Sequence, residues 1–93
     1  MIRSFGDDDT EDLFYRVRVP HWSVELQKIA LRKLLMLHAA PRLEDLSALP
    51  GNRLKKLAGA RKERYSIRIN EQWRICFRWR DGDAYEVQIV DYH

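Results

Sequence analysis

Three stretches in the second half of the chain alternate between apolar and polar side chains, and this pattern constrains the fold more than any other feature. The stretches are residues 64–70, 73–79 and 84–90. A period of two residues is typical of strands in a sheet that buries one face and exposes the other. The predicted buried sets are Tyr65, Ile67 and Ile69; Trp73, Ile75, Phe77 and Trp79; and Tyr85, Val87 and Ile89.

The first half of the chain supplies a long helix that can cover this buried face. Residues 24–40 contain no glycine or proline and carry apolar side chains at helical spacing, between a serine suited to an N-cap, Ser23, and a proline stop, Pro41. Near its end, His38 is placed to act as a cation on the helix dipole. The side predicted to face solvent carries Lys28, Arg32 and Lys33.

Shorter elements complete the predicted fold. The acidic run 7–12 predicts the start of a helix, with a metal site as the alternative interpretation. Residues 2–5 and 52–57 are candidates for strands, and 43–49 for a turn of helix. We therefore expect an α+β fold in which two N-terminal helices pack on one face of a twisted, mainly antiparallel sheet of four to five strands.

The parity of the strands predicts their register, because a slip of one residue would turn polar side chains into the core. A three-residue loop at 81–83 keeps parity, and it places Arg74 opposite Val90 and Gln72 opposite Tyr92. The turn at 70–72 places Arg68 opposite Arg74. We therefore expect Arg68, Arg74 and Tyr92 to share the solvent side of the sheet. There the two like charges would either attract an anion or extend separately into water.

Length and composition exclude several classes of protein. A chain of 93 residues fits one domain, taken here as residues 1–93. Its single cysteine excludes an internal disulfide and, with three histidines, leaves little for a zinc site, so no metal or cofactor is expected. No apolar run approaches the roughly 20 residues of a membrane span, and no signal peptide is evident. We expect a cytoplasmic protein that does not contact the membrane.

Basic residues are concentrated in one part of the chain. Residues 51–74 hold eight basic and two acidic side chains, although the whole chain has a net charge of only +3. A basic segment interleaved with Tyr and Trp indicates a nucleic-acid ligand. An ordinary solvated strand pair is the alternative that charge alone leaves open.

The chain ends in three side chains that can move protons or bind nucleotides, Asp91, Tyr92 and His93. His93 titrates near neutrality, and Tyr92 can stack on a base. With a guanidinium at Arg74 to bind a phosphate, they match what RNA cleavage by the 2′-hydroxyl requires. A frayed C-terminal tail is the alternative. Cys76 is interpreted as a structural thiol.

Several motifs together resemble the HigB toxins, members of the RelE superfamily of bacterial toxin–antitoxin systems. The resemblance runs through the whole chain. It is most specific in the Asn-x-x-Trp-Arg-Ile-x-Phe run and the terminal Asp-Tyr-His. The motifs that carry it are Ile2-Arg3-Ser4-Phe5, Gly51-Asn52-Arg53-Leu54, Tyr65-Ser66-Ile67-Arg68-Ile69-Asn70, Gln72-Trp73-Arg74-Ile75-Cys76-Phe77 and Val90-Asp91-Tyr92-His93.

The resemblance implies a RelE-like fold and a ribosome-dependent mRNA endoribonuclease that yields a 2′,3′-cyclic phosphate without a metal ion. It places catalysis on Arg74, Asp91, Tyr92 and His93. Two positions depart from the pattern, because Ala58 stands where some relatives carry lysine and Lys55 where some carry histidine. Arg53, Lys55 and Lys56 could replace the lost cation, and together with Arg68 they are the residues expected to bind substrate.

The resemblance also implies partners. These are a HigA-type helix-turn-helix antitoxin, the ribosome and its mRNA, with operator DNA contacted only through the antitoxin. Two alternatives stay open. One is a non-catalytic module that blocks translation by occupying the ribosome. The other is a detoxified scaffold that only binds its antitoxin, an interpretation to which Ala58 lends some support.

Overall fold

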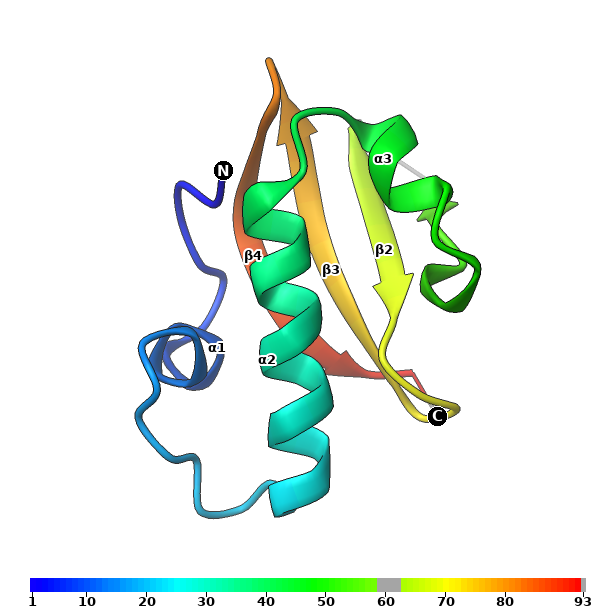
Figure 1. Cartoon of the computed structure of the whole chain (residues 1–93). Coiled ribbons are helices and arrows are strands. Elements are labelled where there is room, and N and C mark those ends of the chain that lie inside the picture. The colour runs from blue at the N-terminus through cyan, green and yellow to red at the C-terminus, as the bar shows by residue number, and fades with distance from the viewer. Residues whose placement is uncertain (59–62, 93) are drawn as a thin grey trace.

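The computed structural model describes residues 1–58 and 63–92 and has an α+β fold (Figure 1). The strands form one antiparallel sheet in the order β1-β2-β3-β4, so β1 is an edge strand. The helices are α1 (Asp8–Phe14), α2 (Val24–Ala39) and α3 (Leu43–Ser47), followed by the 3₁₀ turn η1 (Pro50–Asn52). The strands are β1 (Lys55–Lys56), β2 (Arg64–Arg68), β3 (Trp73–Arg80) and β4 (Asp83–Asp91).

The core lies between α2 and one face of the sheet, along which the helix runs in Figure 1. Leu34 and Leu37 of α2 are fully buried, as are Ile75 and Phe77 of β3. The predicted cap is confirmed, because Ser23 Oγ accepts a hydrogen bond from the Leu26 amide at 3.0 Å. The strict alternation of β3 therefore predicted correctly which of its side chains the helix layer covers.

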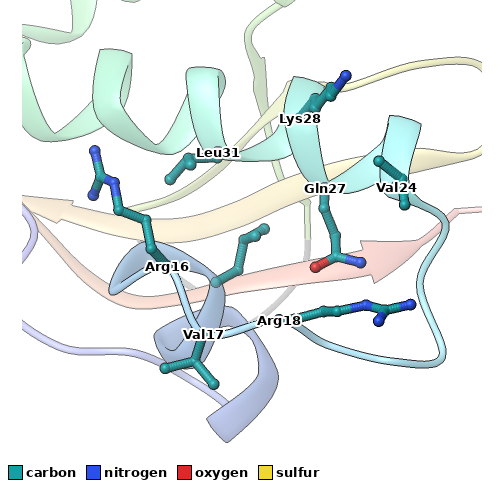
Figure 2. Close-up of a pocket in the computed structure, with 8 residues that line it drawn as sticks. Arg16, Val17, Arg18, Val24, Gln27, Lys28 and Leu31 are labelled. Carbon is teal, nitrogen blue, oxygen red and sulfur yellow. The ribbon is translucent and has the colours of Figure 1, made fainter.

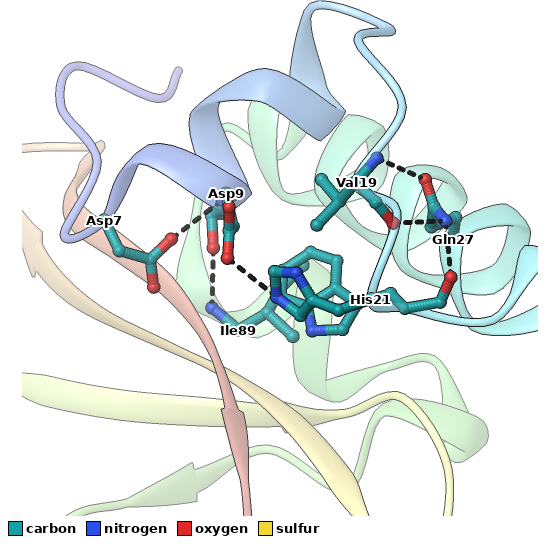
Figure 3. A network of polar contacts seen from close by, with 8 residues as sticks. Asp7, Asp9, Val19, His21, Gln27 and Ile89 are labelled. Carbon is teal, nitrogen blue, oxygen red and sulfur yellow. Dashed lines mark hydrogen bonds and ion pairs between the residues drawn. The ribbon is translucent and has the colours of Figure 1, made fainter.

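The acidic run begins α1, and this helix is tied to the sheet at its first turn. Asp7 caps the helix by accepting from the Thr10 amide at 2.7 Å. Thr10 Oγ1 in turn accepts from the Ile89 amide of β4 at 3.0 Å (Figure 3). The connection between α1 and α2 is held by Gln27 of α2, whose side chain accepts from the Val19 N–H and donates to the Val19 C=O. These contacts fix α1 and the loop after it beside α2.

The turn between β3 and β4 differs from the predicted three-residue loop. Arg80 pairs with Asp83, so only Asp81 and Gly82 lie in the turn, both with positive φ (50° and 83°). This conformation is the type I′ hairpin that Asp-Gly sequences favour. The expected loop was wrong because we relied on parity and gave less weight to local turn chemistry.

A β-bulge on β4 restores the parity that the short turn breaks. The register shifts between Cys76 and Arg78, and Glu86 adopts a positive φ of 52° as the extra residue. Beyond the bulge Arg74 pairs with Val90, and the Tyr92 amide donates to the Gln72 carbonyl, as expected. Before the bulge, however, the faces are exchanged. Ala84 is fully buried, and Tyr85 pairs with Arg78 on the face away from the helices.

The bulge also explains why residues 2–5 form no regular strand. Ile2 and Phe5 make isolated parallel bridges to Ala84 and Val87, on either side of the bulge. Between them Ser4 Oγ accepts from the Glu86 amide at 2.9 Å. The described sheet therefore has four strands, and the N-terminal segment covers the outer edge of β4.

Two polar side chains of α2 make contacts that the sequence did not predict. Lys33 is 8% exposed rather than solvated, and it hydrogen-bonds Asn52. His38 lies in the last turn, as expected, and its Nδ1 accepts from the Ile2 amide at 3.1 Å, which ties the end of the helix to the N-terminal segment. The 52–57 strand candidate is reduced to the two residues of β1. None of the described helices is long and apolar enough to cross a bilayer.

Candidate functional site

The face of the sheet away from the helices carries a row of basic side chains, which we call the cationic face. Register places them there, because Lys55 pairs with Ser66, Arg64 with Arg78, and Arg68 with Arg74. Arg80 follows at the end of β3. The members of the cationic face are Lys55, Arg64, Arg68, Arg74, Arg78 and Arg80.

Arg74 is the most deeply placed of these cations. It is 7% exposed, and its guanidinium is held by three hydrogen bonds. Nε donates to Ser66 Oγ at 2.8 Å, and Nη2 donates to the carbonyls of Arg53 at 2.7 Å and Ser66 at 3.3 Å. We expected this side chain to be solvent-facing. The structure places it on the expected face but buries it, because neighbouring polar groups satisfy its donors.

The surroundings of Arg74 disfavour its positive charge. Burial lowers the pKa of Arg74, and the nearby cations Arg68 and Arg53 lower it further, against a raising effect from Tyr92 and Cys76. An arginine stays protonated in proteins, so the unfavourable charge remains and a nearby anion would be stabilising. A phosphate placed beside Arg74 and Arg68 would relieve both the repulsion and the lost hydration.

Tyr92 lies against the Arg74 guanidinium. The Cζ atom of Arg74 sits 5.8 Å from the centre of the Tyr92 ring, which is a cation–π arrangement. The side chain of Tyr92 is still half exposed. One guanidinium and one accessible aromatic ring therefore meet at the end of the sheet, where a nucleotide could place its phosphate and its base together.

The structure does not bring Asp91 to the same side. Asp91 pairs with Trp73, whose ring contacts Trp22 on the helix side. Because side chains alternate along a strand, the carboxylate leaves β4 on the side opposite Arg74 and Tyr92. One of its oxygens accepts from Gln72 Nε2 at 3.0 Å. The remaining predicted catalytic residue, His93, lies outside the described residues.

The predicted substrate cations divide between two sides of the edge strand. Lys55 lies on the cationic face, whereas Lys56 pairs with Tyr65 and lies on the other side. Arg53, Lys55 and Lys56 are all exposed, and Arg68 is partly buried. Arg53 contributes more than a positive charge, because its backbone carbonyl accepts a hydrogen bond from Arg74. Ala58 is exposed just after β1.

A second part of the cationic face lies at the bulge and between the bulge and the hairpin turn. Glu86 there accepts from Arg64 and from Arg78, both at 3.1 Å. These bonds lower the pKa of Glu86, the hydrogen bond from Arg78 most strongly. A polar hollow of about 320 Å³ adjoins this pair and is lined by Arg78, Arg80, Asp81 and Tyr85. The cationic face therefore extends from Tyr92 to the hairpin turn.

Sequence reasoning missed one component of the site, Ser66. It is fully buried and provides both the hydroxyl and one carbonyl that hold Arg74. The sequence did contain a signal for this contact: a serine on one predicted strand lies diagonal to a basic residue on the neighbouring strand. Cys76 pairs with Ser66 and is also buried, and burial raises the pKa of its thiol, against the lowering effect of Arg74 and Arg64. This supports the structural interpretation of the cysteine.

A separate apolar groove of about 290 Å³ lies between the end of α1 and the start of α2 (Figure 2). Its apolar lining includes the half-exposed Val17 and Val24. Basic side chains from both elements also line it, Arg16, Arg18 and Lys28. The groove belongs to the helix layer, so it and the cationic face are on different sides of the sheet. Within the described residues, no cluster of three or more His, Cys, Asp or Glu side chains is arranged to hold a metal ion.

Comparisons with known proteins match this chain to one family and to several relatives. A family model described as "RelE-like toxin of type II toxin-antitoxin system HigB" matches residues 3–93. A protein named Toxin HigB-1 from Vibrio cholerae is 44% identical over 59 residues, which are 63% of this chain and 62% of that protein. Endoribonuclease HigB from Proteus vulgaris is 42% identical over 41 residues, 44% of this chain and 45% of its own length. An uncharacterized protein from Haemophilus influenzae is 32% identical over 79 residues, 83% of this chain and 78% of that protein.

Proposed function

We propose a function on the premise that this chain belongs to the HigB-like toxins, the RelE-like toxins of type II toxin–antitoxin systems. The proposed activity is endonucleolytic cleavage of mRNA on the translating ribosome. The observation that carries the proposal is the Arg74 guanidinium, fixed by three hydrogen bonds beside the half-exposed ring of Tyr92. The name of the relative from Proteus vulgaris, an endoribonuclease, supports the same activity.

The chemistry follows from what a buried guanidinium can do. The ribose 2′-oxygen attacks the adjacent phosphorus and loses its proton, and the bond from phosphorus to the 5′-oxygen breaks as that oxygen gains a proton. The products are a 2′,3′-cyclic phosphate and a 5′-hydroxyl. Arg74, whose position costs no reorganisation during the reaction, would stabilise the negative charge that grows on the phosphoryl oxygens. The nucleophile is internal to the substrate, so the proposed step uses no metal ion.

The roles of Tyr92 and Asp91 are assigned by the side of the sheet on which each of them lies. Tyr92 would stack on a base and hold the nucleotide in line with Arg74. Proton transfer is proposed for His93, which follows Tyr92 directly in the chain. Asp91 lies on the other side and would act through its bond to Gln72, which stabilises the end of the β3–β4 pair.

The rest of the cationic face would bind RNA backbone. Arg74 and Arg78 are four residues apart on one strand, or about 13 Å, so they would engage different phosphates. Lys55, Arg68 and Arg80 would add contacts with mRNA or ribosomal RNA. Such contacts predict binding that weakens steeply with salt.

The groove between α1 and α2 is proposed as a surface for a HigA-type antitoxin. Its apolar lining and basic rim fit an acidic segment of the partner with one or two apolar anchors. An antitoxin seated only there would leave the cationic face uncovered. Contact with operator DNA would then occur through the antitoxin.

A second candidate function is occupancy of the ribosome without cleavage. The position of Asp91 away from Arg74 favours it, because one of the expected proton carriers is absent from that side. The two functions are distinguished by the fate of a reporter mRNA in a purified translation system. Cleavage produces new 5′-hydroxyl ends within codons, whereas occupancy produces stalled ribosomes on intact mRNA.

The test adds the wild-type chain to translated and to untranslated reporter mRNA and maps 5′ ends by primer extension. We expect ends only in the translated sample, with a cyclic phosphate on the upstream fragment. Arg74→Ala and a chain lacking Tyr92 and His93 should produce none and should no longer inhibit growth, while remaining folded. Full toxicity of both variants at equal expression would refute the assignment.

A further inference from the structure

Lys33 is a buried cation that the proposed reaction does not use. It lies on α2, in the layer of helices, and is 8% exposed. Its Nζ donates to Asn52 Oδ1 at 2.6 Å, and Asn52 is fully buried. Lysine is rarely buried unless it is paired. Met or Leu would fill the same space without the cost of dehydrating an ammonium group, so packing alone does not explain the residue.

Asn52 is fixed by more than this one bond. Its Nδ2 donates to the Leu46 carbonyl of α3 at 3.1 Å and contacts Met36 Sδ at 3.3 Å. Its backbone amide donates to the Leu49 carbonyl at 3.0 Å. The side chain of Asn52 therefore joins α2, α3 and η1, with Lys33 bonded to the one side-chain oxygen.

The next residue, Arg53, connects this arrangement with Arg74 of the cationic face. Arg53 adopts a left-handed conformation, φ 43° and ψ 57°, which is strained for a residue with a Cβ atom. In this conformation its carbonyl accepts the 2.7 Å bond from Arg74 Nη2. Arg53 comes just before β1, which is an edge strand, so its carbonyl reaches the Arg74 guanidinium of the cationic face at this edge of the sheet.

We propose that Lys33 is a positioning residue for Arg74: by holding Asn52, it fixes the Arg53 carbonyl that orients the guanidinium. Lys33 and Arg74 do not touch, and the connection runs through Asn52 and one peptide group. The effect of Lys33 on the geometry of Arg74 does not depend on the reaction that the protein catalyses, whereas its effect on cleavage rests on the function proposed above.

The electrostatics of Lys33 agree with a specific role. Burial lowers the pKa of Lys33, and the charges of Arg32 and Arg68 lower it further. A second cation close to Arg68 adds to the positive potential at the edge where Arg68 and Arg74 meet. The protein keeps a lysine at this position even though burial disfavours its charge.

The test compares two substitutions of neighbouring cations on the same helix. Lys33→Met removes the bond to Asn52, and Arg32→Met removes an exposed cation of α2 outside the groove and serves as the control. In ¹⁵N NMR spectra of the full chain, we expect separate Nη1 and Nη2 signals for Arg74 in the wild type, because the Nη2 bonds slow rotation of the guanidinium. Lys33→Met should merge or broaden these signals, and Arg32→Met should preserve them.

A kinetic measurement on translating ribosomes accompanies the spectra. We expect Lys33→Met to lower kcat on the order of 10-fold or more with KM nearly unchanged, since a misplacement of about 1 Å can cost about 10²-fold. The double variant Lys33→Met with Asn52→Leu replaces the polar pair by apolar groups of similar size. It should lower kcat as Lys33→Met alone does. It keeps the test valid if the single variant does not fold.

The outcomes separate this inference from the proposed function. Resolved Nη signals and an unchanged kcat in either folded variant would overturn the role of Lys33. Merged signals in a wild-type protein that never cleaves mRNA would overturn both claims, because Arg74 would then be neither fixed nor catalytic. Resolved wild-type signals that merge in the variants, without cleavage by any of them, would confirm the positioning and refute the endoribonuclease.

Discussion

The two faces of the sheet are held by different forces. On the helix side, Ile67, Ile75 and Phe77 are fully buried against α2 by apolar packing alone. On the cationic face, Ser66 and Arg74 are also buried, but by hydrogen bonds to the guanidinium and by the Tyr92 ring. The comparison teaches that apolar packing buries one face, whereas on the other face hydrogen bonds bury a guanidinium and fix its orientation.

The largest effect should follow from breaking the helix side. Phe77→Ala should lower the free energy of unfolding by about 3–5 kcal/mol, because it opens a cavity in a fully packed layer. The control is its neighbour on the other face, Cys76→Ala, which removes only a small thiol and should cost much less. Urea denaturation measures both. Equal costs would show that the two faces do not differ as described.

A smaller effect should separate partner binding from RNA binding. Val17→Asp places a carboxylate in the groove of the helix layer and should weaken antitoxin affinity by about 2 kcal/mol or more, as the loss of a central contact does. Leu35→Asp, on an exposed part of α2 outside the groove lining, is the control. Calorimetric titration with the antitoxin gives the two affinities. Loss of affinity in Leu35→Asp alone would place the partner elsewhere.

Tyr92 tests whether the aromatic ring contributes beyond its contact with Arg74. Tyr92→Phe keeps the ring over the guanidinium, whereas Tyr92→Ala removes about 0.5–1 kcal/mol of cation–π energy and the stacking platform. We expect cleavage to fall strongly only in Tyr92→Ala, with nearly wild-type stability in both. If Tyr92→Phe is equally inactive, the hydroxyl takes part in proton transfer and the stacking role is insufficient.

The smallest effect concerns pH. The folded pKa of Glu86 lies below its unfolded value, so the stability it provides is present above the unfolded pKa and is lost as pH falls through the folded pKa. The ion pair of Glu86 with Arg64 is partly exposed, which limits its contribution to the free energy of unfolding to about 1 kcal/mol or less. Glu86→Gln should flatten the acid limb of a plot of denaturation midpoint against pH. An unchanged slope between the two proteins would exclude this contribution.

The sequence was most informative where local pattern and burial agree. Alternation predicted the helix-facing side chains of β3, and Ser23 and Pro41 predicted the bounds of α2 within two residues. It failed at the β3–β4 hairpin because two local rules compete there. The Asp-Gly turn sets one parity, and the bulge at Glu86 restores the other, so Tyr85 and Ala84 exchange faces.

The candidate site was predictable as a set of residues but not as a geometry. Strand register predicts that Arg68, Arg74 and Tyr92 share one face, and the strand pairing confirms this for Arg68 and Arg74. The burial of Arg74 and of Lys33 could not be predicted, because it depends on the Arg53 carbonyl, on Ser66 and on the Asn52 side chain, which approach from distant sequence. These contacts are formed by tertiary structure and leave no periodic signal.

The most direct test of the central claim replaces Arg74 by lysine, which keeps the charge and cannot reproduce the bonds from Nε and Nη2 together. The measurement is the yield of new 5′ ends in a reporter mRNA translated with purified components. A fixed guanidinium predicts a loss of about 10²-fold or more, at a temperature where Arg74→Lys remains folded. Cleavage at the wild-type rate would contradict the account, because any cation on that face would then be sufficient.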